Sequence, residues 1–172
     1  AKLADEKWSP DAIAITLIDL QNSDKPEMAE HRGTVPCYPA SVVKVCYMAA
    51  VFEWARLGKL KIDADLERDL RDMIGPSSNK ATQRIVDRLC GTSDGPELSG
   101  KAYEEFVAKR QSVNRWLHGL GLKGINACQK TYDGDEISPR DGQFLRNGKP
   151  SGPFTNRNAM TTRDAAKLLS WI

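Results

Sequence analysis

The hydrophobic and polar positions near the start of the chain predict a strand hairpin. The run 12–20 is rich in β-branched residues and is bounded by turn formers, which indicates a buried strand. Positions 21–26 predict a turn, and 27–33 predict the returning strand. Prolines at 36 and 39 then exclude a helix in the segment that follows.

Beyond position 40 the pattern becomes helical. Positions 41–57 are apolar with almost no charge before Glu53, which is typical of a helix buried in the middle of a domain, and Gly58 ends it. Further helices are predicted over 63–74, 79–89, 103–120 and from Thr161 or Thr162 to the end. Segments 90–100 and 126–158 are rich in turn formers. A loop as long as the second is usually functional or mobile.

Composition narrows the classes of function. A chain of 172 residues with 40% apolar and 28% charged residues is typical of one globular domain, or of two small lobes that share a core. The net charge is only +2 and no basic block is interleaved with aromatic residues, so we expect no nucleic-acid partner. No apolar run approaches the roughly 18 residues of a membrane span.

The cysteines Cys37, Cys46, Cys90 and Cys128 lack metal-ligand spacing. We therefore predict no metal, and no motif indicates another cofactor. The cysteines are expected to be small buried hydrophobic residues, although their even number also permits disulfides in an oxidising compartment.

The candidate chemistry begins at Ser41-Val42-Val43-Lys44, which has the form S-x-x-K. Residues three apart lie on one face of a helix, and a lysine amine that burial keeps neutral can take the proton of a serine hydroxyl. Because Lys44 sits in an otherwise uncharged run, burying it without a role would be costly. The alternative interpretation is a capping serine followed by a surface lysine.

A second polar element, Ser77-Ser78-Asn79, lies between two predicted helices. Its hydroxyl could pass a proton to a leaving group, and its amide could hold a substrate carbonyl. The alternative is an ordinary helix N-cap, which serine and asparagine both favour.

Together the two elements resemble the serine β-lactamases and penicillin-binding proteins, whose motifs are S-x-x-K, S-D-N and K-T-G. The likeness is greatest to the class A β-lactamase group. It rests on the segments 38–44, 73–82, 114–121 and 160–169, which occur in the family's order. The resemblance implies a single α/β domain over 1–172. Its helical lobe would span about 45–150, and its antiparallel sheet lobe 1–44 and 151–172.

The resemblance also implies roles for four residues. Ser41 would be the acylated nucleophile, and its backbone amide would form half of the oxyanion hole. Lys44 would be the base or proton relay. Ser77 would pass a proton to the leaving nitrogen, and Asn79 would position the substrate amide.

Three departures from the family pattern matter. Ser78 replaces the aspartate of S-D-N, at a largely structural position. The long loop has no Glu-x-x-Leu-Asn pattern to supply the glutamate that activates the deacylating water. It holds Glu136 and the carboxylates of Asp133, Asp135 and Asp141, and none of them matches residue by residue. No K-T-G or K-S-G occurs, so we expect the C-terminal strands to be absent and this chain alone to be inactive.

The expected function is a serine acyl-transfer hydrolase of class A β-lactamase type. Its partner would be a small-molecule β-lactam or a D-alanyl peptide, and a complementary C-terminal fragment could supply the missing strands. The resemblance implies a periplasmic or secreted location. Two alternatives remain: a D-alanyl-D-alanine peptidase or transpeptidase, and a non-catalytic binding module with the same fold. A K-T-G or K-S-G in a C-terminal segment would favour an enzyme.

Overall fold

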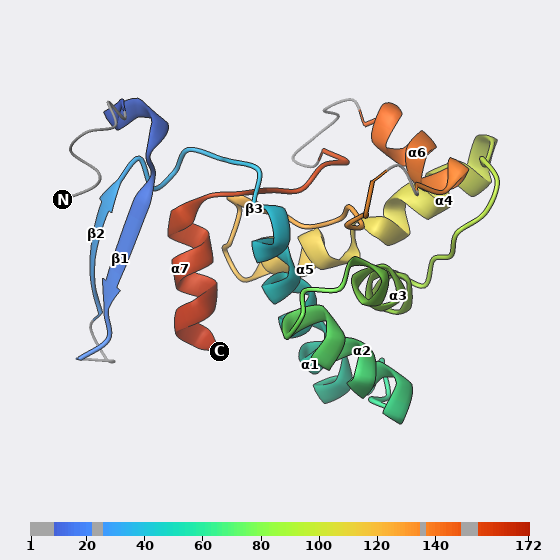
Figure 1. Ribbon diagram of the computed structural model, residues 1–172, viewed down its shortest axis with the longest axis horizontal. Coiled ribbons are helices and arrows are strands. Elements are labelled where there is room, and N and C mark those ends of the chain that lie inside the picture. The colour runs from blue at the N-terminus through green and yellow to red at the C-terminus, as the bar shows by residue number, and fades with distance from the viewer. Residues whose placement is uncertain (1–8, 22–25, 135–136, 149–154) are drawn as a thin grey trace.

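The computed structural model describes residues 9–21, 26–134, 137–148 and 155–172, which form helices and two small antiparallel sheets (Figure 1). The strands pair as β1 (Ile15–Asp19) with β2 (Glu27–His31), and β3 (Ile125–Asn126) with β4 (Ala159–Met160). The helices are α1 (Lys44–Arg56), α2 (Ala64–Ile74), α3 (Asn79–Cys90), α4 (Gly100–Arg110), α5 (Ser112–Gly119), α6 (Pro139–Arg146) and α7 (Thr162–Trp171).

Local sequence signals place most of these elements where they were predicted. Side-chain oxygens of Asp63, Ser78 and Thr161 accept the first free amides of α2, α3 and α7, as helix N-caps do. Gly58, at φ 69°, follows the end of α1 in the left-handed conformation that favours glycine.

Two predicted segments differ from the structure. The helix expected over 103–120 is two helices, α4 and α5, because the chain turns at Gln111. The long loop 126–158 contains α6, which Ser138 caps and Pro139 begins. Serine followed by proline at the first helical position is a helix start, and the high turn content of the surrounding sequence obscured it.

The main core forms around α1. Buried residues of α1 pack with those of α2, α3 and α5, and α7 contributes Leu168. Val43, Cys46, Tyr47, Ala50 and Val51 of this region have no exposed surface. The core therefore fixes α1 and α3 against each other, and the candidate site residues lie at the N-terminal ends of these helices or just before them.

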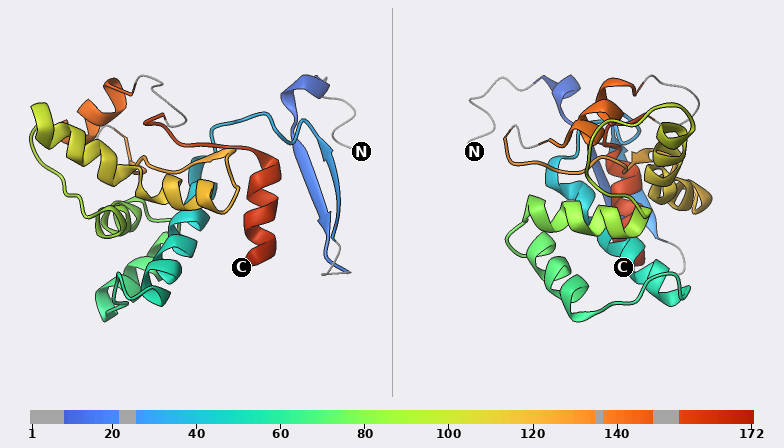
Figure 2. Two further views of the ribbon diagram at one scale, coloured as in Figure 1. Left: turned by 180° about the vertical axis from the view of Figure 1, so that it is seen from behind. Right: turned by 90° about the vertical axis from the view of Figure 1, so that its right-hand side faces the viewer.

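The β1–β2 hairpin lies against α7 at one side of the molecule (Figures 1 and 2). The hydroxyl oxygens of Thr16 and Thr162 are 2.9 Å apart, and Glu30 pairs with Arg163. The other face is open in the described structure, where Ile15 is 49% and Leu17 66% exposed. The prediction of a buried strand is thus wrong, because α7 covers one face of the hairpin only.

The division into a sheet lobe over 1–44 and 151–172 and a helical lobe over about 45–150 stays a prediction. β3 lies within the range assigned to the helical lobe, yet it pairs with β4 from the sheet-lobe range. Within the described ranges, no helix has the length and apolar character that crossing a membrane requires.

Candidate active site

Ser41 lies on a short 3₁₀ helix, Ala40–Val43, that leads directly into α1. The segment before it is fixed by Cys37, which exchanges two backbone hydrogen bonds of 2.9 Å with Met160. Ala40 has a φ of 46°, a conformation that costs energy for a residue with a Cβ. The Ser41 side chain is exposed, so it is accessible to a substrate.

Ser41 and Lys44 were predicted to share one face of an α-helix, and in the structure a 3₁₀ helix gives them the same relative direction. The sequence predicted an α-helix from position 41, whereas α1 begins at Lys44. In a 3₁₀ helix, side chains three apart eclipse each other. The backbone N–H of Lys44 also donates to the carbonyl of Ser41. The two side chains therefore leave the same face of the chain.

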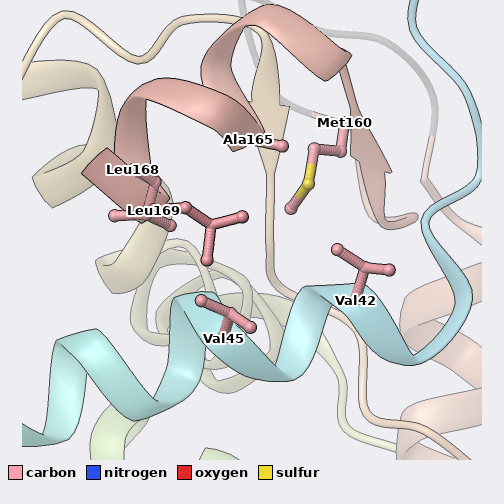
Figure 3. A pocket seen from close by; sticks show the side chains of 6 residues that line it. All are labelled: Val42, Val45, Met160, Ala165, Leu168 and Leu169. Carbon is pink, nitrogen blue, oxygen red and sulfur yellow. The ribbon is translucent and has the colours of Figure 1, made fainter. Parts of the chain in front are cut away.

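Apolar packing holds this segment against α7. Figure 3 shows the hollow between them, which is lined by Val42, Val45, Met160, Ala165, Leu168 and Leu169. The Val42 and Val45 side chains point from α1 and the preceding turn toward those of β4 and α7 (Figure 3). Because all six side chains are apolar, the hollow positions the segment that holds Ser41 and contributes no chemistry itself.

Lys44 is buried, with 2% of its surface exposed. Its amine donates to the backbone carbonyl of Ser77 at 2.5 Å, to the Ser77 hydroxyl at 2.9 Å and to Oδ1 of Asn79 at 2.9 Å. Burial lowers the pKa of Lys44, and the negative charge of Asp133 opposes that shift. The surface-lysine interpretation is therefore wrong.

Of Ser77 and Ser78, one caps the helix and the other contacts Lys44, and the sequence alone did not show which. Ser78 caps α3, since its hydroxyl accepts from the amide of Ala81 at 3.2 Å. Ser77 lies just outside the helix with a φ of 61°, and its exposed side chain turns toward Lys44. The N-cap interpretation thus applies to Ser78, whereas the hydroxyl of Ser77 is free of that role.

Asn79 joins the lysine to the long loop. Its Oδ1 accepts from Lys44, while its Nδ2 donates to the carbonyl of Tyr132 at 3.1 Å and to Oδ1 of Asp133 at 2.6 Å. A carbonyl and a carboxylate only accept, and an ammonium only donates. The three partners therefore fix which way the Asn79 amide points.

The loop follows one face of α3. Gln83 donates to the carbonyl of Thr131 at 2.9 Å, and Asp87 accepts from Lys130 at 2.7 Å. Together with Asn79, these residues are spaced four apart and lie on one helix face. Gln83 and Asp87 were not predicted from the sequence, although polar residues at positions 79, 83 and 87 were a signal that this face binds polar groups.

The base of the loop is closed by Asn158, which is 5% exposed. Its Oδ1 accepts from the amides of Cys128 at 3.0 Å and Gln129 at 2.9 Å, and its Nδ2 donates to the carbonyl of Gln129 at 3.0 Å. The Tyr47 hydroxyl, on α1, donates to the same carbonyl at 2.7 Å. The loop is thus tied to the helix that follows Ser41.

A buried ionic cluster supports the loop from beneath. Lys130, Arg110 and Asp141 are each 1% exposed. Lys130 pairs with Asp94 at 2.5 Å and with Asp141 at 3.2 Å, and Arg110 pairs with Asp141 at 2.5 Å. Burial alone would lower the pKa of Lys130, but its hydrogen bonds with carboxylates raise it. Lys130 is therefore held charged as an anchor.

The cysteines lie apart from this chemistry. Cys46, Cys90 and Cys128 are buried, as expected, and burial raises the pKa of Cys46 and of Cys128 to about 12. Cys37 is exposed, contrary to expectation, because it lies in the extended segment before Ser41.

The structure thus brings Lys44, Ser77 and Asn79 into direct contact and places Ser41 one turn before Lys44. Of the carboxylates named in the loop, Asp133 reaches this group and Asp141 belongs to the ionic cluster. Asp135 and Glu136 lie outside the described residues. The arrangement combines an accessible hydroxyl, a buried amine, a second hydroxyl and an oriented amide, which are the parts of an acyl-transfer site.

Comparison with known proteins agrees with the motifs. Searches of curated proteins and of solved structures return no match. A model of the beta-lactamase enzyme family matches residues 3–172. Because this match spans nearly all of the 172 residues, in agreement with the resemblance in the sequence, the chain belongs to the beta-lactamase enzyme family.

Proposed function

We propose that the protein is a serine acyl-transfer hydrolase of the class A type that opens β-lactam amides through an ester on Ser41. The observation that carries the proposal is the buried amine of Lys44, bonded to both Ser77 and Asn79. An amine in such a place is expensive to bury as a structural feature, and its lowered pKa suits a base.

In this mechanism, neutral Lys44 accepts the proton of Ser41 as the Ser41 Oγ bonds to the β-lactam carbonyl carbon. Lys44 then returns that proton through the Ser77 hydroxyl to the ring nitrogen as the carbon–nitrogen bond breaks. The contact of 2.9 Å between Lys44 and Ser77 fits this transfer. Water later cleaves the ester, and Ser41 regains its proton.

Asn79 binds the substrate in this scheme. Both hydrogens of its Nδ2 are donated to the loop, to the Tyr132 carbonyl and to the Asp133 carboxylate, so a substrate carbonyl binds Nδ2 by replacing one of these acceptors. From the family resemblance, we also propose that the protein acts in the periplasm or is secreted.

The test is intact-protein mass spectrometry with excess benzylpenicillin, on the protein together with any complementary segment that co-purifies. The proposal predicts an added penicilloyl mass in the wild type and none in Ser41→Ala. An adduct that forms but persists for hours would favour the peptidase alternative. Absence of any adduct from well-folded wild type would favour the non-catalytic binding module.

A further inference from the structure

A carboxylate that no motif indicated reaches the candidate site. Asp133 accepts from Nδ2 of Asn79 at 2.6 Å, and its charge acts on Lys44, where it opposes the effect of burial on the lysine. Its own side chain is exposed on the loop. Asp133 thus lies at the end of a chain of contacts from Ser77 through Lys44 and Asn79.

The position of Asp133 is determined by the loop and by α3 together. Two residues earlier, the Thr131 carbonyl is held by Gln83, and one residue earlier, the Tyr132 carbonyl is held by Asn79. Lys130 is anchored beneath by Asp87 and Asp94. Successive residues of the loop are therefore bound in register along the helix, and the next position falls beside Asn79.

This geometry gives the carboxylate two separable effects. As an acceptor it holds the NH₂ group of Asn79 toward the loop, which leaves Oδ1 facing Lys44. As a negative charge it favours the ammonium form of Lys44. An asparagine at position 133 would keep the acceptor and lose the charge, whereas an alanine would lose both.

We infer that Asp133 is a positioning residue of the site, which orients the Asn79 amide so that its Oδ1 faces the Lys44 amine. The inference rests on the proposed function for its role in acylation, but its physical content concerns Lys44 and Asn79 alone. It can therefore be tested without turnover.

The experiment is an NMR titration of the Lys44 side chain, with the signal assigned by its loss in Lys44→Arg. In Asp133→Asn, the midpoint for Lys44 should move to lower pH than in the wild type. In Asp133→Ala, the Asn79 side-chain amide signals should shift as well. Asp65→Asn, which changes an exposed aspartate of α2, is the matched control and should move neither signal.

Acylation by benzylpenicillin supplies the second measurement. Asp133→Asn should move the acid limb of the pH–rate profile in the same direction as the titration, and Asp133→Ala should slow acylation by roughly tenfold or more through loss of the hydrogen bond. Unchanged Asn79 amide signals in Asp133→Ala would overturn the inference, even if acylation proceeds. Shifted Asn79 signals without any acylation by the wild type would instead retain the inference and reject the proposed function.

Discussion

The amine of Lys44 lies 2.9 Å from the hydroxyl oxygen of Ser77, although 33 positions separate the two residues in the chain. The rest of α1, the connection 57–63, helix α2 and the turn after it fill that interval, and the core between α1 and α3 brings its ends together. Because Lys44 is buried and Ser77 is exposed, the contact connects the interior to the surface that a substrate can reach.

Replacing Lys44 by methionine should slow acylation by about 10²–10⁴-fold, since that is the usual contribution of a positioned general base. Methionine keeps the length and apolar character of the stem but cannot accept a proton. The measurement is the rate of adduct formation by mass spectrometry. Lys123→Met, at an exposed lysine, is the control and should acylate at the wild-type rate. Equal rates in the two variants would remove Lys44 from the mechanism.

The pH dependence of acylation has a definite sign. Since burial lowers the pKa of Lys44 below its ordinary value of 10.5, the neutral amine becomes available at lower pH than for a free lysine. The acylation rate of the wild type should therefore rise with pH and reach half of its maximum below pH 10.5. A rate that falls over this range would contradict a neutral Lys44 as the base.

Breaking the buried ion pair between Arg110 and Asp141 should cause a large loss of stability. Both residues are 1% exposed, and removing one takes away the shortest ion pair of the other. Asp141 would then keep only Lys130 at 3.2 Å, and Arg110 only Asp87 at 3.7 Å, among the ion pairs of the described residues. Arg110→Met and Asp141→Leu should each lower the free energy of unfolding by roughly 3–5 kcal/mol, as measured by urea denaturation. The double variant should be more stable than the sum of the two losses predicts. Simple additivity would show that the ion pair does not couple these positions.

Substitutions of Ser78 should change the stability of the fold by a smaller amount, through the cap of α3. Ser78→Ala removes the cap of α3 and should cost about 1 kcal/mol. Ser78→Asp retains a capping oxygen and adds a negative charge at the helix N-terminus, so it should match or exceed the wild type. Thermal unfolding checks both variants. If Ser78→Ala were as stable as the wild type, the cap would not contribute.

Asp63 predicts a pH-dependent part of stability. Hydrogen bonds from Arg88 and from the Leu66 amide lower the pKa of Asp63 from 3.8 to about 2. The unfolded chain therefore binds the Asp63 proton more tightly than the folded chain does. The stabilisation is present above pH 4 and is lost as the pH falls toward 2. The difference in melting temperature between wild type and Asp63→Asn should shrink over this range. A difference that is constant with pH would exclude the charge of Asp63 as its origin.

The sequence predicted those parts of the structure that depend on local signals. Helix caps such as Asp63 and Thr161, and the apolar run after Ser41, determine where helices lie. The motif also selected Lys44, Ser77 and Asn79, which the fold brings into contact. Whether these residues perform catalysis stays a prediction.

The parts that were missed depend on contacts between distant segments. Asp133 and Asn79 are 54 positions apart, and no local pattern relates them. Lys130 reads as an ordinary loop lysine until α3 and α6 surround it with carboxylates. The exposed face of β1 was missed for the same reason, because apolar residues indicate a preference for burial and do not specify what covers them.

At position 77 the backbone conformation favours glycine, whereas the proposed reaction requires the hydroxyl of serine. With a φ of 61°, any side chain costs roughly 1–2 kcal/mol there, and glycine would relieve that cost. Glycine would also delete the hydroxyl that meets Lys44. A search for more stable variants should therefore select Ser77→Gly, and a search for acylating variants should reject it. Serine at position 77 is therefore the residue expected in a chain selected for acylation, and glycine is the residue expected in a chain selected for stability alone.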